Sequence, residues 1–123
     1  MISPVLALHT LAHTLGLAFA PKPGGKRSSQ WPKIRAKHLL RESRCMVCGT
    51  SKKLNVHHCL PYHLRPDLEL DPSNLITLCE STDGGCHLMF GHLGSFTSWN
   101  PSVRGDAEMW FRKIVARPTS RKT

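Results

Sequence analysis

Apolar residues dominate positions 4–18 and predict a helix there. Ser3 and Pro4 stand at its start, and serine as N-cap with proline at the first helical position is a common way to begin a helix. This helix is too hydrophobic to stand alone and must pack on another surface, either the body of the protein or a second subunit. We therefore assign residues 1–20 to an apolar N-terminal helix.

A basic linker and helix are expected next, over residues 21–44. Pro, Gly, Ser and Lys crowd Pro21–Gln30, which is typical of a linker. Pro32–Ser43 follows as a predicted basic helix. The candidates for the inward side of this helix are Ile34, Leu39 and Leu40.

Two short strands and a helix are predicted within the following segment, 45–98. Leu54–His58 alternates weakly between apolar and polar residues, and Leu75–Leu78 is a short apolar run, so both are typical of strands. A proline-rich irregular loop lies between them. Cys86–Leu93 is expected to open a helix, because a turn containing two glycines precedes it.

The chain is expected to end in a helix and a basic tail, over residues 99–123. Pro101 marks a turn, and the helix begins at Ser102 or Asp106 and runs to about Ala116. The residues that this helix is expected to bury are Val103, Met109, Trp110 and Ile114.

The composition indicates that the fold needs a structural staple. The chain has 123 residues with nine Gly and nine Pro, so its core is small and rich in loops. Its five cysteines could act as disulfides or as metal ligands. The spacing favours metal, because the pair Cys45 and Cys48 is followed by Cys79 and Cys86, and four thiolates fill one tetrahedral Zn²⁺. The fifth, Cys59, is expected to be a small buried apolar residue.

The positive charge of the chain is concentrated in one block. The formal net charge is +9, and residues 22–53 contain ten Lys and Arg against a single acidic residue, Glu42. Such a block favours a polyanionic partner, most simply nucleic acid, with a solvated basic face as the alternative. The residues expected to bind nucleic acid are Lys33, Arg35, Lys37, Arg41, Arg44, Lys52 and Lys53, and Arg104, Arg112 and Lys113 are expected to add phosphate contacts.

The first twenty residues also bear on localisation. Residues 18–20 look like a signal-peptidase site, but no Lys or Arg precedes the apolar run, and His9 and His13 interrupt it. No segment of the sequence is long and apolar enough to span a membrane. Reduced thiolates suit the cytoplasm, and we expect the protein there, without membrane association.

The order of chemically active residues over 45–93 resembles that of the HNH nuclease family. The matching positions are Cys45, Cys48, the L-x-V-H-H run ending in His58, Pro61, Asn74-Leu75, Leu78-Cys79 and Cys86-His87. The resemblance implies an α+β fold: a small ββα-metal core with a four-cysteine zinc knuckle, flanked by helices. One departure is the six residues between Cys79 and Cys86, where the family has two, and we interpret Ser81–Gly85 as an inserted turn.

The resemblance implies a role for each central side chain. His58 is the expected general base, since a neutral imidazole can take a proton from water near pH 7. Asn74 joins it in the catalytic site by tying down the loop that orients the base. His57 and His87 are the expected ligands of a catalytic metal ion.

His92 is a candidate third ligand with an unusual spacing. It comes five residues after His87, which takes a side chain off a regular helical face. Either Gly91 ends or distorts the helix and lets His92 reach the ion, or His92 is only nearby. Of the remaining histidines, His63 is expected at the surface or on the substrate side, and His38 is expected to face phosphate or solvent.

These patterns predict a metal-dependent HNH endonuclease that hydrolyses DNA phosphodiester bonds, by nicking or double-strand cleavage, through a one-metal mechanism. The implied cofactors are a structural Zn²⁺ and a catalytic Mg²⁺, Mn²⁺ or Ni²⁺, with Zn²⁺ also suitable. Small stand-alone members are commonly phage- or prophage-encoded and assist genome packaging, so candidate partners beside DNA are a phage terminase and a second copy of the chain. The alternatives are a non-catalytic, zinc-stabilised nucleic-acid-binding protein and a secreted disulfide protein.

Overall fold

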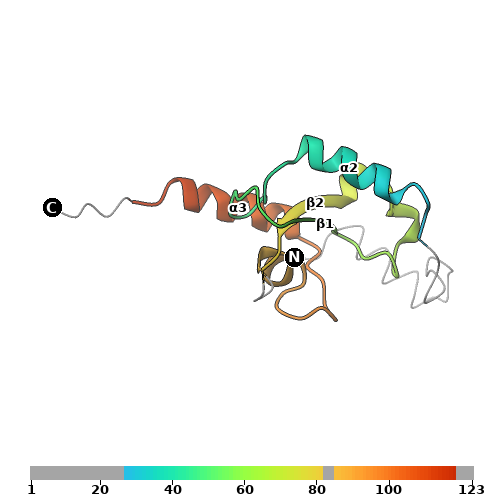
Figure 1. The fold of residues 1–123 in the computed structure, drawn as a ribbon. Helices are drawn as coiled ribbons and strands as arrows, with labels where there is room; N and C mark the ends of the chain where they lie inside the picture. The colour runs from blue at the N-terminus through green and yellow to red at the C-terminus, as the bar shows by residue number, and fades with distance from the viewer. Residues whose placement is uncertain (1–26, 82–84, 119–123) are drawn as a thin grey trace.

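A two-stranded antiparallel sheet forms the centre of the computed structural model, which describes residues 27–81 and 85–118 (Figure 1). Strands β1 (Leu54–His58) and β2 (Leu75–Cys79) pair so that His57 lies opposite Ile76. Both strands lie where the sequence predicts them. The predicted N-terminal helix, residues 1–20, lies outside the described residues.

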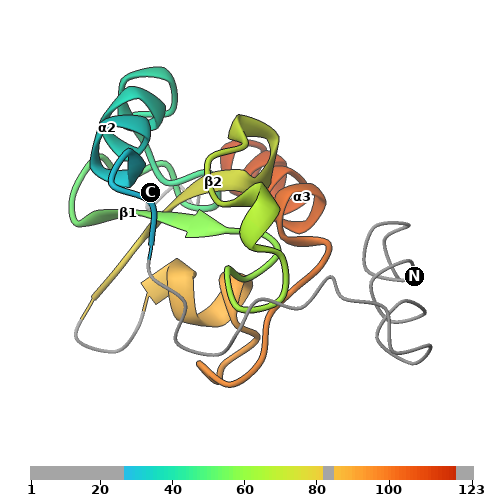
Figure 2. The same cartoon turned by 90° about the vertical axis from the view of Figure 1, so that its right-hand side faces the viewer.

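Helices cover the sheet from two sides. Helix α2 (Trp31–Arg41) lies above the strands, and the short π-helix η3 (His87–Gly91) lies below them (Figures 1 and 2). The two strands followed by a helix give the α+β fold and the ββα order that the sequence predicts. Within the described residues, no helix has the length and apolarity needed to cross a membrane.

The connection between the strands is irregular, as expected, but it contains two short 3₁₀ helices. These are η1 (Pro66–Leu68) and η2 (Pro72–Asn74), and each begins with a proline. Proline suits this position because its missing N–H has no partner at the start of a helix. The Asp71 side chain accepts a hydrogen bond from the Ser73 amide and caps η2.

The core is small and is built around β2. Four of the five β2 residues are buried, since elements on both sides cover this strand. Helix α3 (Val103–Val115) completes the core with its first two turns. The fully buried cluster comprises Cys45, Val47, Ile76, Leu78, Val103 and Ala107.

The inward face of α2 differs from the prediction. Leu40 is 84% exposed, whereas His38 is 3% exposed. His38 stands one turn before Glu42, and its Nε2 lies 3.2 Å from Glu42 Oε1, so the carboxylate gives the buried ring a partner. A residue two positions further along a helix points to the opposite side, which carries Leu40 into solvent. The expectation that His38 faces phosphate or solvent is therefore wrong.

The burial predicted for α3 is correct only at its start. Val103 is buried as expected, but Trp110 is 46% exposed, and Met109 is exposed to a similar extent. The reason is that α3 projects away from the sheet after its first two turns (Figure 1). Trp110 instead packs at the edge of the core against Phe90, with 5.9 Å between the ring centroids.

Candidate metal centres and catalytic cleft

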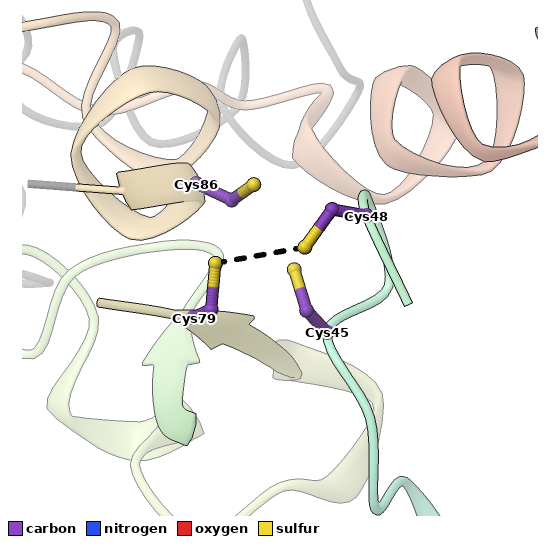
Figure 3. A group of neighbouring side chains, drawn as sticks. All are labelled: Cys45, Cys48, Cys79 and Cys86. Carbon is purple, nitrogen blue, oxygen red and sulfur yellow. Dashed lines mark hydrogen bonds between the residues drawn. The ribbon is translucent and has the colours of Figure 1, made fainter. Parts of the chain in front are cut away.

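Four cysteine sulfurs converge on one point (Figure 3). Cys45 and Cys48 come from the turn before β1, Cys79 ends β2, and Cys86 directly precedes η3. All four Sγ atoms lie within 4.8 Å of one another, and those of Cys48 and Cys79 are 3.7 Å apart. Tetrahedral zinc with Zn–S bonds of about 2.3 Å requires sulfurs about 3.8 Å apart, so the cluster fits a zinc ion. None of the five cysteines forms a disulfide, and Cys59 is not part of the cluster.

The cluster already favours a thiolate before any ion is considered. The pKa of Cys45 is lowered to about 4, first because the Cys86 thiol hydrogen-bonds to its sulfur and then because neighbouring backbone amides do the same. The pKa of Cys86 is raised for the matching reason, since it keeps the proton that it shares with the Cys45 thiolate. Binding of a metal ion would displace the proton that the Cys86 thiol retains.

Gly85 accommodates the six residues between Cys79 and Cys86. Its φ is +61°, and a Cβ at this position would lie 2.8 Å from the carbonyl oxygen of Cys79. Only glycine lets the backbone pass so close in this conformation. The returning chain therefore brings Cys86 back to the cluster despite the longer connection.

Three histidines form a second cluster. His57 lies in β1, His87 begins η3, and His92 follows its end. The Nε2 atom of His87 lies 3.1 Å from His57 Nδ1 and 3.2 Å from His92 Nε2. One nitrogen from each ring thus faces the same point, and all three lie within 4.8 Å of one another.

Hydrogen bonds on the far side of two rings fix which nitrogen carries a lone pair. His87 Nδ1 donates to Glu80 Oε1 at 2.7 Å, and His92 Nδ1 donates to the Ser98 carbonyl oxygen at 2.7 Å. In the neutral ring each Nε2 is then an acceptor, and the two acceptors face each other. Converging lone pairs repel unless a cation lies between them, and such outer hydrogen bonds are a regular feature of metal-bound histidines.

Burial favours the neutral form of the His57 and His87 imidazoles. The pKa of His57 is lowered to about 3, chiefly by burial and then by the neighbouring His87 and His92. Burial likewise lowers the pKa of His87, although Glu80 opposes the shift. Neutral imidazole is the form that binds a metal ion.

The π-helix explains the spacing of His92. In a π-helix the hydrogen bonds join residues five apart, so side chains at this interval share a face. Of the two alternatives that the sequence left open, this is the one in which the helix is distorted near Gly91, where η3 ends. Gly91 has a further function, because a Cβ there would lie 3.0–3.2 Å from the His57 ring.

A cleft of about 450 Å³ opens beside the histidine cluster. His57, His87 and His92 reach it from one side, and His58 reaches it from the end of β1. Its other walls are mainly aromatic and basic, formed by Arg27, Trp31, Arg35, Tyr62, His63, Phe96 and Trp99.

His58 is oriented to accept a proton. Its Nε2 donates to the Glu69 carbonyl oxygen at 2.9 Å, which leaves Nδ1 as the acceptor of the neutral ring. Trp31 packs on the ring, with 4.5 Å between the centroids. Burial lowers the pKa of His58, and nearby Arg27 lowers it further against the opposing hydrogen bond to Glu69. The ring is therefore neutral near pH 7.

Asn74 closes the loop that supports His58. Its Oδ1 accepts from the Leu60 amide at 2.9 Å, and its Nδ2 donates to the carbonyl oxygens of Leu60 and Leu68. Leu68 directly precedes Glu69, whose carbonyl group holds the His58 ring. The Glu69 carboxylate, itself buried, accepts from the Ser28 amide at 3.1 Å and ties the start of the described chain to this loop. No pattern in the sequence distinguishes Glu69 from its acidic neighbours Asp67 and Asp71.

The basic residues divide between the cleft and other surfaces. Arg35 lines the cleft, and so does Arg27, which the sequence did not single out as a site residue. The other predicted basic residues on α2 and before β1 are exposed: Lys33, Lys37, Arg41, Lys52 and Lys53.

Two arginines instead have internal partners. Arg44 lies over the Phe111 ring, and Arg104 contacts Glu42 and the Leu75 carbonyl oxygen. His63 is exposed at the rim of the cleft.

Residues 45–90 match the protein-family model described as HNH endonuclease. No curated protein and no solved structure matches the chain. The matched segment contains all four clustered cysteines together with His57, His58, Asn74 and His87, and it ends before His92.

Proposed function

We propose that the protein is a metal-dependent endonuclease that hydrolyses DNA phosphodiester bonds, because residues 45–90 match the family model described as HNH endonuclease. The main support is the second cluster: the four cysteines suffice for a closed structural site, while three more ligands and His58 line one open cleft. Closed sites stabilise a fold and open sites perform chemistry. A protein that only binds nucleic acid would need neither the open cluster nor His58.

The two clusters suit different ions. The cysteines would hold a structural Zn²⁺, and His57, His87 and His92 would hold the catalytic ion. Imidazole ligands with remaining open positions suit Zn²⁺, Ni²⁺ and Mn²⁺, and the family adds Mg²⁺. Once bound, a divalent ion supplies positive charge that neutralises the phosphate and the departing oxygen.

His58 performs the proton transfer in the proposed reaction. Its Nδ1 takes a proton from a water molecule in the cleft, while its Nε2 remains fixed to the Glu69 carbonyl group. The water oxygen attacks phosphorus, the bond from phosphorus to the 3′ oxygen breaks, and solvent protonates the leaving oxygen. The products are the 5′-phosphate and 3′-hydroxyl ends that the family resemblance implies.

The surrounding residues position the substrate and the base. Arg27 and Arg35 lie in the wall of the cleft, where their guanidinium groups can hold backbone phosphates. Asn74 acts at a distance, by fixing the loop that carries the Glu69 carbonyl group. Such phosphate contacts fix the register of DNA but read little sequence.

For the biological setting, we propose from the family resemblance alone a cytoplasmic role in phage genome packaging, with a terminase as partner. A second copy of the chain, packed through the apolar N-terminal segment, would place two active sites on one duplex. Such a dimer would allow cleavage of both strands.

Relaxation of supercoiled plasmid tests the proposed activity. Purified protein is incubated with Mg²⁺, Mn²⁺, Ni²⁺ or EDTA, beside His87→Ala, and the zinc content is measured for both proteins. We expect metal-dependent nicking by the wild type and a strong loss in the variant, with about one zinc retained in each. DNA binding without cleavage by the wild type under every metal would favour the binding-protein alternative.

A further inference from the structure

A loop with exposed apolar side chains stands beside the histidine cluster, outside the segment that matches the family. Residues 93–99, which come after η3, form this rim loop. Leu93 is 59% exposed and Phe96 is 63% exposed. Their exposure indicates that the fold does not use them for its own packing.

The rim loop is held in place by hydrogen bonds. The Gly94 amide donates to the Leu88 carbonyl oxygen at 2.9 Å, and the Ser98 amide donates to the Ser95 carbonyl oxygen at 2.9 Å. Ser98 also joins His92 twice, through its hydroxyl group and through its carbonyl oxygen. Leu93 adopts a φ of 54°, which is uncommon for a residue with a large side chain. The loop therefore presents its apolar side chains in a fixed position.

Phe96 is the part of this loop nearest to the proposed chemistry. The centroid of its ring lies 5.0 Å from that of His92 and 5.9 Å from that of His87. It lines the cleft together with Arg27 and Arg35. An exposed aromatic ring thus shares the cleft with two arginines and with the histidine cluster.

We propose that Phe96 is a stacking platform for an unpaired DNA base adjacent to the scissile phosphate, so that the substrate class is DNA with locally unpaired bases. This rests on the proposed nuclease function. The arginines supply charge complementary to the backbone on either side of such a base. Aromatic side chains stack on the open face of any base with little regard to sequence.

An intact duplex fits this arrangement less well. Both faces of each paired base are already stacked, so an aromatic side chain must first open a base step before it can insert. DNA that already has a bulged or single-stranded base avoids this cost. The proposal therefore predicts tighter binding to DNA with a bulged base than to its fully paired counterpart.

Binding without cleavage provides the first test. A fluorescent oligonucleotide with a single-base bulge and its fully paired counterpart are titrated with the zinc-loaded protein in buffer without added Mg²⁺, Mn²⁺ or Ni²⁺. We expect the wild type to bind the bulged DNA more tightly, and Phe96→Ala to lose about tenfold in affinity for it. Phe96→Tyr should keep most of the preference, whereas Phe96→Leu, which is apolar but cannot stack in the same way, should lose most of it.

A base analogue reports the contact itself. With 2-aminopurine at the bulge, the wild type and Phe96→Tyr should quench its fluorescence, and Phe96→Ala should not. Equal affinity for both DNAs, equal losses on both in Phe96→Ala, or full retention by Phe96→Leu would overturn the proposal. So would self-association of the wild type that Phe96→Ala abolishes, because the ring would then serve a contact between copies. Zinc content and circular dichroism of each variant establish that it is folded.

Failure of this proposal is separable from failure of the nuclease function. Cleavage is measured afterwards by adding the metal that supports plasmid nicking. A Phe96-dependent preference in binding without any cleavage would contradict the nuclease function alone. Cleavage with no preference for the bulged DNA would contradict the stacking role alone.

Discussion

At the scale of single residues, the histidine cluster depends on a position that has no side chain. Gly91 ends η3 against the ring of His57, and the distances to a would-be Cβ are 3.0–3.2 Å. The His57 ring is buried and surrounded by the other two ligands, so it has little room to yield. The ligand geometry is therefore sensitive to one methyl group.

Gly91→Ala is expected to displace the His57 ring by a few tenths of an ångström or more and to lower the cleavage rate by up to about 100-fold. Zinc content should not change, because Gly91 does not contact the cysteine cluster. Plasmid nicking and metal analysis measure the two effects. Gly105→Ala is the matched control, since a Cβ there meets nothing within 4 Å and should leave the rate unchanged. Full activity in Gly91→Ala would show that the ring position is not critical.

Residue identities along the chain predicted which side chains cluster as candidate ligands, but not the residues that support them. Cys45, Cys48 and the His57-His58 pair are recognisable because ligand type and spacing are local properties of a sequence. Glu69 binds the His58 ring through its carbonyl oxygen and the Ser28 amide through its carboxylate, and Glu42 binds the Thr77 amide. These partners are far apart in the sequence, so no local pattern indicates the two glutamates. His38 was misjudged for the same reason, since its burial depends on a tertiary contact.

At the scale of elements, Glu42 joins three of them. It follows α2, its carboxylate accepts from the Thr77 amide in β2 at 2.8 Å, and Arg104 in α3 donates to it at 3.1 Å. The Thr77 hydroxyl group donates in turn to the Glu42 carbonyl oxygen. One acidic residue in a basic block thus satisfies polar groups that the core would otherwise leave unpaired.

The buried contact between His38 and Glu42 predicts a pH dependence of stability. Burial lowers the pKa of His38 below its ordinary value of 6.5, so the unfolded chain takes up the proton first as the pH falls. Stability is then full above pH 6.5 and decreases below it. Although burial raises the pKa of Glu42, hydrogen bonds from Arg104 and Thr77 outweigh this and leave the pKa below 4.5. A second loss is therefore expected as the pH falls below 4.5.

Urea unfolding of the wild type and of His38→Gln, from about pH 8 to about pH 5, measures the first of these losses. The variant lacks the titrating group, so its stability should fall less steeply, and the difference between the two proteins should change only below pH 6.5. Acid effects on the zinc site are common to both proteins and cancel in this difference. Parallel curves over the whole range would contradict the burial of a neutral His38.

The elements also show where sequence patterns succeed and where they fail. Strand β1 was predicted from its weak alternation of apolar and polar residues, and strand β2 from its short apolar run. The sequence left open whether helix η3 is regular or distorted. The five-residue interval from His87 to His92 was the sign of its π-form. The outward projection of α3 could not be foreseen, because its spacing of apolar residues does not reveal how far the core extends.

At the scale of the whole molecule, the cysteine cluster and the histidine cluster are joined through adjacent residues. Cys86 belongs to the cysteine cluster and His87 to the histidine cluster, and both stand at the start of η3. The cysteines also tie the turn before β1 to the end of β2. The position of the histidine cluster therefore depends on the cysteine cluster.

Removal of zinc is expected to unfold the protein. The apparent binding free energy of a structural zinc ion, about 10–16 kcal/mol, is comparable to the whole stability of a small domain, about 5–15 kcal/mol. Cys48→Ser should likewise lower the melting temperature strongly, whereas Cys59→Ala, outside the cluster, should have a much smaller effect. Circular dichroism during chelation measures the transition. A chelated protein with an unchanged melting temperature would show that the cysteines do not hold the fold together.

The proposal that the open cleft is a catalytic site is tested most directly by the rate of plasmid nicking in His58→Ala and His63→Ala. Both histidines line the cleft, but only His58 has a ring held by Glu69 and packed against Trp31. We expect His58→Ala to lower the rate by about 100-fold or more, with DNA binding and zinc content retained, and His63→Ala to lower it by less than about tenfold. Equal rates for His58→Ala and the wild type would contradict the assignment of the general base and, with it, the proposed mechanism.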